Sequence, residues 1–330
     1  MIAADAARGD DVRMIRALEF FTRNFFVWTI LGGGLALIWP GLFTWFKGLW
    51  IQIGLGVIML GMGLTLNFDD FKRVFRMPRP ILLGVFLQFT IMPALGWSAG
   101  RLFGLPDHYA VGLILVASCP GGTASNVIAF LARANTALSV SMTAISTMLA
   151  VAMTPLLTGL LAGSRMEVDV IGLFTSTAMV VLLPVTLGVL LNRFLPRVTE
   201  TLRPVAPAVA VLLIVIIVAS ILGKSRGVFL KLEEGGGYRM LFAVLFLHAL
   251  GFGLGYGLAR LLSGDERSAR TVSIEVGMQN SGLGVILARA HFAANPLVAV
   301  PSALSALTHC IFGSLAAAWW GRRKVDGEEV

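Results

Sequence analysis

The stretch CPGGTASN, residues 119–126, lies in the middle of an apolar run over residues 108–132. Proline removes a backbone donor and glycine is a poor helix former, so Pro120 and the two glycines after it should break a helix there. A second stretch, EVGMQNSG at residues 275–282, lies at a matching depth in the apolar run over residues 270–290. Both stretches place polar side chains inside apolar runs, where such groups need partners. The two breaks therefore predict one shared binding site.

The composition around these stretches is that of an integral membrane protein. Of 330 residues, 57% are hydrophobic and 13% are charged, against roughly 25% charged residues in an ordinary soluble domain. So few charges cannot cover the surface of a soluble protein of this size, which excludes that class. The net charge of +8 does not indicate a nucleic-acid partner, because the basic residues are scattered between apolar runs. In that position they suit the anionic headgroups of a lipid bilayer.

The number of membrane spans follows from the apolar runs between charged residues. A membrane helix needs about 20 mainly apolar residues to cross ~30 Å of hydrocarbon. Ten candidate spans result, at residues 25–39, 50–66, 81–103, 108–132, 136–162, 170–191, 205–222, 240–262, 270–290 and 296–320. We therefore expect an all-α polytopic membrane protein with ten transmembrane helices.

The lysines and arginines between the spans predict the orientation, since they are enriched in cytoplasmic loops. Placing the N-terminus inside puts most of the 26 lysines and arginines on the cytoplasmic side. The one discordant loop carries Lys224, Arg226, Lys231 and Arg239. We therefore expect a multi-pass protein of the plasma (inner) membrane with both termini cytoplasmic.

The matching positions of the two breaks predict an internal repeat. Ten helices divide into two sets of five, and an odd number per half inverts the second half relative to the first. Each break then falls in the fourth span of its half, an arrangement that recurs in transporters built from inverted repeats with discontinuous helices. We expect residues 1–163 to form the first five-helix repeat and residues 164–330 the second.

Glu275 is the one acidic residue that lies well inside a predicted span. A carboxylate at mid-membrane costs about 2.5–3.5 kcal/mol on insertion scales, so it is kept where something compensates its charge. No lysine or arginine of the same span lies deep enough to do so, since Arg270 is at the helix entrance. The favoured interpretation is a bound cation. A protonated carboxyl that is hydrogen-bonded to the helix break is the alternative.

Neutral oxygens elsewhere in the predicted spans could complete a cation site, because hard cations prefer hydroxyl, amide and carbonyl oxygens. The candidates are Ser125 and Asn126 after the first break, Ser139 and Thr143 on one helix face, Gln88 in the third span and Gln279 at the second break. The half-helices that begin after each break present free N–H groups and positive dipole ends, which suit an anion. An anion held close to the cations indicates symport.

These motifs resemble the bile acid:sodium symporter family, in particular its bacterial branch. The matching stretches are residues 60–66 (LGMGLTL), 119–126 (CPGGTASN), 275–282 (EVGMQNSG) and 290–292 (AHF). The resemblance extends over residues 25–320. It implies a panel domain of spans one, two, six and seven. It also implies a core domain of spans three to five and eight to ten, about residues 78–162 and 238–320, in which spans four and nine are unwound and cross.

The resemblance also implies two sodium ions per cycle and a substrate contact set. The first sodium site would comprise Ser125, Asn126, Ser139, Thr143 and Glu275, and the second Gln88, Glu275, Val276, Met278 and Gln279, with backbone carbonyls at Val276 and Met278. Substrate contacts would fall on Thr123, Ala124, Asn280, Ser281 and His309. One position departs from the pattern, because Cys310 stands where similar bacterial members tend to have asparagine.

The sequence therefore predicts a secondary active transporter, a sodium-coupled symporter of an organic anion that works by alternating access. The anion would resemble a bile acid or be a small carboxylate such as pantoate or ketopantoate, as the family implies. We expect no enzymatic activity, no organic cofactor, no nucleic-acid partner and a monomer in the lipid bilayer. The alternatives are a proton-coupled anion carrier and, from another class, a passive channel or membrane receptor.

Overall fold

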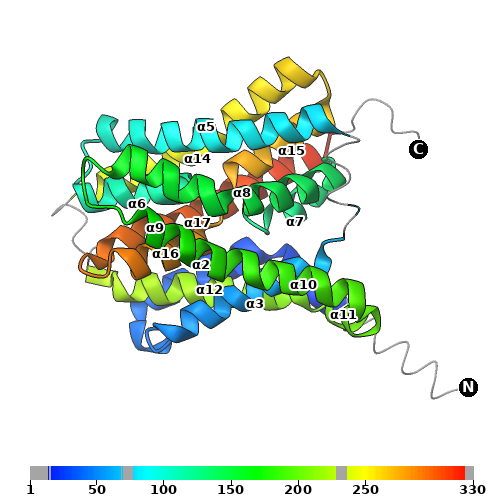
Figure 1. The fold of residues 1–330 in the computed structure, drawn as a ribbon, viewed down its shortest axis with the longest axis horizontal. Coiled ribbons are helices and arrows are strands. Elements are labelled where there is room, and N and C mark those ends of the chain that lie inside the picture. The colour runs from blue at the N-terminus through cyan, green and yellow to red at the C-terminus, as the bar shows by residue number, and fades with distance from the viewer. Residues whose placement is uncertain (1–13, 15, 68, 70–76, 228–235, 324–330) are drawn as a thin grey trace, which may run out of the picture.

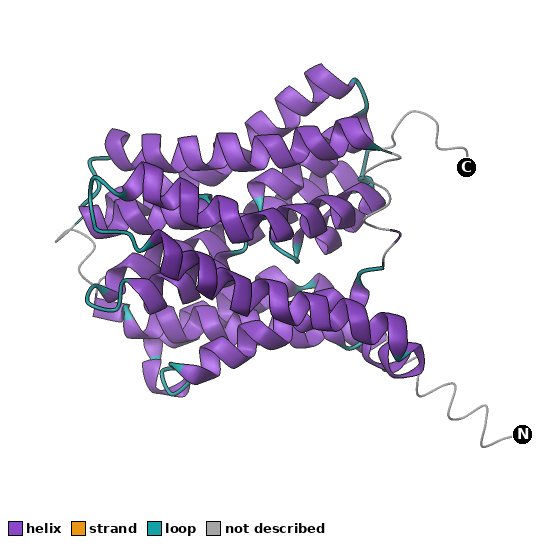
Figure 2. Ribbon diagram, in the orientation of Figure 1, coloured by secondary structure: helices purple, strands orange, loops and turns teal. Residues whose placement is uncertain are grey.

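The structure, a computed structural model, describes residues 14, 16–67, 69, 77–227 and 236–323. Within these residues every regular element is a helix, and the sole strand-like pairing is one isolated bridge between Gly121 and Gln279. The long helices run roughly parallel or antiparallel to one another, as expected for an all-α membrane protein (Figure 1). Short loop segments also lie inside the bundle, between helix ends that meet there (Figure 2).

One group of helices lies mainly in the lower half of Figure 1. It comprises α2 (Phe25–Ile38), the short η1 (Pro40–Leu42), α3 (Leu49–Thr65), α12 (Ala206–Lys224), and a continuous rod of α9 (Val170–Thr177), η2 (Ala178–Leu182) and α10 (Leu183–Phe194), followed by α11 (Pro196–Leu202). In this group α10 packs along α3, and α12 packs along both α2 and α3. A helix over residues 16–23 precedes α2 and meets it at 62°.

The second group holds the two stretches that the sequence predicts as breaks. It comprises α5 (Pro78–Leu102), α6 (Asp107–Ala117), α7 (Ser125–Leu131), α8 (Thr136–Ala162), α14 (Gly237–Ser263), α15 (Glu266–Gly277), α16 (Ser281–His291), η3 (Pro296–Ala299) and α17 (Val300–Gly321). Helix α14 packs along α15 and α5, and α17 lies against α6, α7, α14 and α16. The predicted spans at 108–132 and 270–290 are thus each two helices joined by an irregular segment.

Fewer helices are long and apolar enough to cross a membrane than the sequence predicts. Six pass this test among the described residues, and a seventh is added if α2 and the bent helix before it are taken as one span. The other predicted spans correspond to shorter helices. Helix α3 has 17 residues, and the broken pairs α6/α7 and α15/α16 divide their spans into pieces of 7 to 12 residues.

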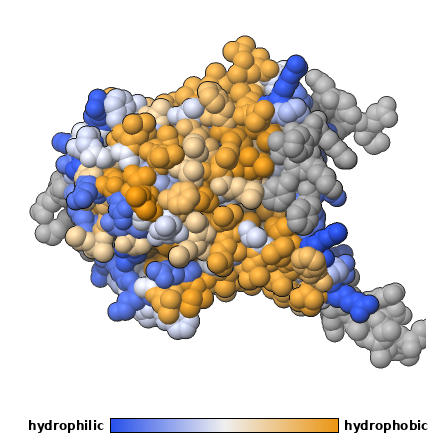
Figure 3. Space-filling model, viewed as in Figure 1, coloured by the Kyte–Doolittle hydropathy of each residue, from blue (hydrophilic) through white to orange (hydrophobic). Residues whose placement is uncertain are grey.

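The surface agrees with membrane residence. On the face in view an apolar surface extends across the middle of the molecule from its upper to its lower edge, and hydrophilic residues gather toward the two ends of the helices (Figure 3). Exposed side chains on several helices include Leu82, Phe86, Leu160 and Ile171, which are more than half exposed. Side chains of this type face lipid without cost, whereas a soluble protein would bury most of them.

Two boundaries show how well the sequence locates the helices. Helix α8 covers residues 136–162, as predicted, and the side chain of Asn135 caps its start by accepting from the N–H of Leu138 at 3.0 Å. Helix α15 instead begins at Glu266, four residues before the predicted start, because the Asp265 carboxylate caps it. Burial raises the pKa of Asp265, but hydrogen bonds from Ser268 and its backbone N–H outweigh that effect and leave the pKa below its ordinary value.

The prediction that both termini are cytoplasmic concerns residues outside the described part of the chain, since residues 1–13 and 324–330 are not described. The same holds for Lys231 of the discordant basic loop and for Lys72, Arg73 and Arg76. The orientation therefore stays a prediction.

Candidate functional site

The two helix breaks lie against each other and exchange backbone hydrogen bonds. The N–H of Gly122 donates to the carbonyl of Met278 at 2.8 Å, and the N–H of Asn280 donates to the carbonyl of Pro120 at 2.8 Å. Breaking a membrane helix leaves backbone groups without partners, and in hydrocarbon each such group costs several kcal/mol. Each break therefore supplies the partners that the other has lost. The predicted stretches form one joint, which we call the crossing.

Glycine at the crossing is required by this close approach. A Cβ atom on Gly122 would lie 2.8 Å from the carbonyl oxygen of Gln279, and one on Gly121 would lie 2.9 Å from Oε2 of Glu275. Contacts that short do not occur for real side chains, so a larger residue would have to push the two breaks apart. Proline and glycine thus have separate tasks, since Pro120 ends the helical hydrogen bonding and the glycines admit the second chain.

The Glu275 carboxylate, 2% exposed on α15, lies beside the crossing in a cage of hydroxyls. Ser125 at the start of α7 donates to its Oε1 at 2.5 Å, and Thr143 on α8 donates to its Oε2 at 2.8 Å. Ser139, one turn before Thr143, also contacts Oε1. The Asn126 side-chain oxygen lies 2.8 Å from the Ser139 hydroxyl and 3.4 Å from that of Thr143. The structure therefore brings all five residues of the first predicted sodium set together.

This cage has more acceptor oxygens than its hydroxyl groups have hydrogens to donate. A hydroxyl donates one hydrogen, yet Ser139 faces both Glu275 and Asn126, and Thr143 faces these two and the carbonyl of Ser139. Among the described residues no lysine or arginine forms an ion pair with Glu275. An oxygen-rich, acceptor-rich cluster around one buried carboxylate has the chemistry of a site for a hard cation.

A second polar group contacts both breaks, around Gln88 of α5. The Gln88 amide donates to the carbonyl of Cys119 and to Oε1 of Gln279, each at 2.9 Å, and Gln279 donates to the carbonyl of Val276 at 2.9 Å. The remaining oxygen of Gln88 is buried and has no hydrogen-bond partner among the described residues. A buried oxygen without a donor costs free energy unless a cation or a water satisfies it, so this group also fits a cation.

The remaining members of the second predicted set, Met278 and Glu275, have other hydrogen-bond partners. The Met278 carbonyl is a partner of Gly122 in the crossing. The hydrogen bonds of Glu275 run to Ser125, Ser139 and Thr143, and none of them reaches Gln88. Hydrogen bonds thus join Gln88, Val276 and Gln279. That Glu275 belongs to both sodium sets stays a prediction.

A cavity of about 240 Å³ opens beside the crossing, between the two helix groups. Thr123, Ala124 and Asn126 of the first break line it, together with apolar side chains of α2, α3 and α12. Arg23, at the end of the helix before α2, is the charged residue on its wall. A cavity with a mainly apolar wall, a few hydroxyl and amide groups and one arginine suits an organic anion.

The other predicted substrate residues are buried and do not line this cavity. Asn280 caps α16, because its side-chain oxygen accepts from the N–H of Leu283 at 3.1 Å. Ser281 shares a hydrogen bond of 2.9 Å with Ser305, and His309 lies 4% exposed beside His248, with ring centroids 5.6 Å apart. Thr123 and Ala124 are the members of the predicted substrate set that reach the cavity.

Two residues of this region were not singled out from the sequence. Arg23 lies just before the first predicted span. Its position at the edge of an apolar run without charges is the one feature of the sequence that could have marked it. His248 of α14 hydrogen-bonds the last carbonyl of α15, at Gly277, and the hydroxyl of Ser305, each at 2.8 Å. Through Ser305 this histidine connects the end of α15 to Ser281 at the start of α16. No pattern of residues around His248 in the sequence indicates that role.

Crossed helix breaks inside an apolar bundle, with a buried carboxylate at the joint and a cavity beside it, define a class of protein. Irregular backbone is tolerated at this depth where it is buried or lines a cavity, and discontinuous helices that hold ions are typical of secondary transporters. The described residues hold no cluster of three or more histidine, cysteine, aspartate or glutamate side chains that could form a catalytic metal centre. The fold and the site are those of a membrane transporter.

Comparison with known proteins identifies the family. Residues 52–232 match the model of the Sodium Bile acid symporter family. The chain is 46% identical over 304 residues to the probable sodium/metabolite cotransporter BASS1, chloroplastic, of Arabidopsis thaliana, an alignment that covers 92% of this chain and 75% of the relative. It is also 43% identical over 312 residues to the uncharacterized sodium-dependent transporter YocS of Bacillus subtilis (strain 168), covering 94% of this chain and 95% of the relative.

The chain belongs to the sodium bile acid symporter family. It is accordingly a sodium-dependent membrane transporter and not an enzyme. The family membership confirms both the resemblance noted in the motifs and the prediction of a transporter.

Proposed function

We propose that this protein is a symporter that couples the entry of sodium ions to the uptake of an organic anion by alternating access. The observation that carries the proposal is the cage around Glu275, in which three hydroxyls and an amide oxygen from α7 and α8 surround one carboxylate of α15. Binding sodium there would neutralise a charge that is costly at mid-membrane. It would also tie α7, α8 and α15 together at the crossing.

Two sodium ions per cycle are proposed, one at each polar group of the crossing. The first would bind Ser125, Asn126, Ser139, Thr143 and Glu275, and the second Gln88, Val276, Gln279, Met278 and Glu275. The unpaired oxygen of Gln88 supports the second position, because it is a buried ligand atom without a donor. Since both groups contact the breaks, each ion would help to fix the crossing in one conformation.

The anion would bind in the cavity beside the first break. The proposed contacts are Thr123 and Ala124, and Arg23 adds a positive charge on the same wall. The remaining wall is mainly apolar, which favours a carboxylate with a hydrocarbon part, such as a bile acid or a small carboxylate like pantoate or ketopantoate. Asn280, Ser281 and His309 would reach the anion after a rearrangement of the helices. The relatives are named for transport of sodium with a metabolite, which is consistent with a small substrate.

We also propose the architecture that would perform this exchange. The ten predicted spans would form two inverted repeats, residues 1–163 and 164–330. The helix group around α2, α3, α10 and α12 would be the panel, and the group that carries the crossing would be the core. The core would move against the panel to expose the cavity to one side and then the other. The protein would lie in the plasma membrane, as a monomer, with both termini cytoplasmic.

Uptake into proteoliposomes under imposed gradients tests the coupling ion. We expect a labelled carboxylate such as pantoate to accumulate above its equilibrium level with an inward sodium gradient and not with an inward proton gradient, because the cage is built of neutral oxygens that suit a dehydrated cation. Accumulation that follows the proton gradient and ignores sodium would favour the proton-coupled carrier. Equilibration without accumulation under either gradient would favour a channel.

The Gln88→Leu variant tests the second ion. Leucine has a similar size but no ligand oxygen, so we expect the apparent Hill coefficient for sodium in anion uptake to fall from about 2 toward 1 if one of two sites is lost. The half-saturating sodium concentration should rise as well. The measurement is initial uptake rate against sodium concentration. Gln52→Leu, a change of the same type in α3, should leave the sodium dependence as it is, and a Hill coefficient unchanged in Gln88→Leu would contradict a ligand role for Gln88.

A further inference from the structure

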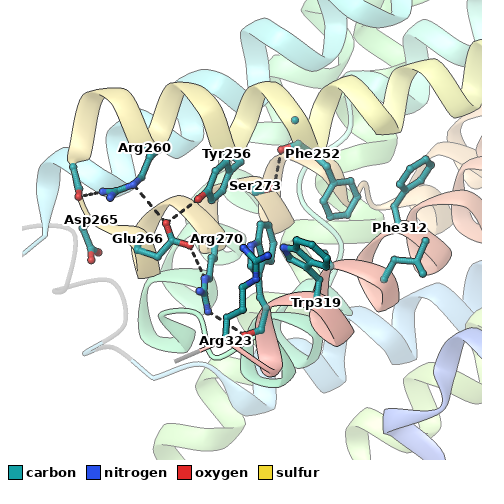
Figure 4. A pocket seen from close by; sticks show the side chains of 15 residues that line it. Phe252, Tyr256, Arg260, Asp265, Glu266, Arg270, Ser273, Phe312, Trp319 and Arg323 are labelled. Carbon is teal, nitrogen blue, oxygen red and sulfur yellow. Dashed lines mark hydrogen bonds and ion pairs between the residues drawn. The ribbon is translucent and has the colours of Figure 1, made fainter. Parts of the chain in front are cut away.

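A second, larger cavity lies away from the crossing, where α14 ends and α15 begins. It measures about 1070 Å³ and is lined by side chains of α14, α15 and α17, including Arg260, Arg270, Arg323 and Trp319 (Figure 4). We call it the arginine–tryptophan cavity. It shares no lining residue with the cavity beside the first break. The sodium coupling proposed above does not use it.

One end of the arginine–tryptophan cavity is charged and carries an excess of arginine. Glu266 has partners within the protein. It accepts hydrogen bonds from Nε of Arg270 and the hydroxyl of Tyr256, each at 2.8 Å, and lies 3.5 Å from Nε of Arg260. Asp265 accepts from the N–H groups at the start of α15, where it acts as the helix cap. Both carboxylates of the cavity therefore have partners within the protein.

The arginines differ in how far they are available to a ligand. Arg270 is buried, with its side chain 3% exposed, and it also donates to the carbonyls of Ala132 and Trp320, each at 3.3 Å. Arg260 is about half exposed, and the guanidinium of Arg323 lies 3.9 Å over the ring of Trp319 at the end of α17. Arg260 near the end of α14 and Arg323, two residues after the end of α17, thus place positive charge on an accessible part of the cavity wall (Figure 4).

The other end of the cavity is apolar and open toward the surface. Phe252, Phe312 and Leu315 line it, and Leu315 and Trp319 are 61% and 59% exposed. In a membrane protein such exposed apolar side chains face hydrocarbon. Gly321 follows Phe312 by nine positions on α17, which corresponds to about 14 Å along the helix axis. The charged and apolar ends are therefore separated along the direction in which the helices cross the membrane.

We propose that the arginine–tryptophan cavity binds an anionic phospholipid. Its phosphate group would lie between Arg260 and Arg323, and one acyl chain would run along Phe312 and Leu315. A guanidinium matches a phosphate in charge and in its paired donors. Tryptophan is enriched at the level of the headgroups, and basic pockets between membrane helices bind anionic headgroups. A soluble anion would match the charged end but would leave the apolar end unfilled.

A bound lipid would act on the helix that carries the ion site. Ser273 of α15 lines the arginine–tryptophan cavity and donates to the carbonyl of Phe252 on α14 at 2.7 Å. Glu275 follows two residues later and faces α7 and α8 instead. The lipid would therefore bridge α14, α15 and α17 behind the crossing, and its binding would stabilise the folded protein by mass action.

Thermal unfolding of the purified full chain in detergent tests the proposal. We expect dioleoylphosphatidylglycerol to raise Tm by on the order of 5 °C more than dioleoylphosphatidylcholine, which has the same chains but a zwitterionic headgroup. The double variant Arg260→Ala with Arg323→Ala should lose this difference. Its Tm in phosphatidylcholine should stay close to that of the unmodified chain, because buried Arg270 keeps its contacts with Glu266. Native mass spectrometry should show loss of the retained anionic lipid.

The matched control is Arg322→Ala, which removes an exposed arginine next to Arg323 that does not line the cavity. This variant should keep the preference for phosphatidylglycerol. Equal stabilisation by both lipids, or an equal loss in Arg322→Ala, would overturn the proposal. The same shift with inorganic phosphate alone would assign the cavity to a soluble anion instead. A lipid preference that appears only after deletion of residues 324–330, which hold three acidic residues, would assign the cavity to the chain's own tail.

Discussion

The Glu275→Gln variant should lose sodium-dependent anion uptake by a factor of about 100 or more. The change removes the one charge inside the cage and replaces an acceptor oxygen by an NH₂ group that can only donate. A neutral cage with an added donor no longer compensates a dehydrated cation, and a lost charge-assisted contact of about 3 kcal/mol corresponds to roughly a hundredfold in affinity. The measurement is initial uptake in proteoliposomes over a range of sodium concentrations.

The same variant should separate ion binding from folding. Sodium should raise the Tm of the unmodified chain relative to an equal concentration of choline, because a ligand that binds the folded state stabilises it. In Glu275→Gln this sodium-dependent shift should disappear, while the Tm in choline should not fall, since the amide relieves a buried charge. Glu200→Gln, the same change at an exposed residue of α11, should leave uptake and the sodium shift intact. Sodium-dependent uptake that persists in Glu275→Gln would reject the cage as the ion site.

The positions of the helices could be predicted largely from the sequence, because charges and turn residues mark most of their ends. Helix α8 has a signal at both ends, with Asn135 as its cap and Gly163 after it. The predictions failed where charged residues lie inside a helix. Arg270 was expected at a helix entrance, but it is buried in α15 because Glu266, one turn earlier, pairs with it at 2.8 Å. When charged residues are taken as the ends of spans, an ion pair inside a helix is not predicted.

The candidate site was predictable in its residue types more than in its geometry. Polar residues in apolar runs are visible one by one, so Glu275, Ser139 and Thr143 could be selected from the sequence. The contact between Ser125 and Glu275 joins residues 150 positions apart, and no spacing within either segment specifies it. The matching depth of the two breaks placed both residues in one candidate cation site, and the division of the ligands between two sodium sites came from the family resemblance. His248 was missed for the same reason, since its partners Gly277 and Ser305 belong to other helices.

The Gly122→Ala variant should disrupt the crossing while adding a single carbon atom. The new Cβ would lie 2.8 Å from the carbonyl oxygen of Gln279 and 3.2 Å from its carbonyl carbon, and these are backbone atoms that cannot rotate away. The breaks would have to separate, which weakens the hydrogen bonds that Gly122 and Asn280 donate across the crossing at 2.8 Å. Added atoms in a packed interior cost about 1–3 kcal/mol. We therefore expect a lower Tm and at least a tenfold loss of sodium-dependent uptake.

A matched substitution distinguishes this close approach from a general effect of replacing glycine. Gly34 of α2 has nothing within 4 Å of the position that a Cβ would take, so Gly34→Ala should keep uptake and could raise Tm through its better helix propensity, worth up to about 1 kcal/mol. A Gly122→Ala protein with normal uptake and a normal sodium-dependent shift in Tm would contradict the close contact of Gly122 with the backbone of Gln279. Because the partners of Glu275 and of Gln88 both include residues of the two break segments, Ser125 for Glu275 and Cys119 and Gln279 for Gln88, separating the breaks should impair both proposed ion sites together. The Gln88→Leu change should impair one.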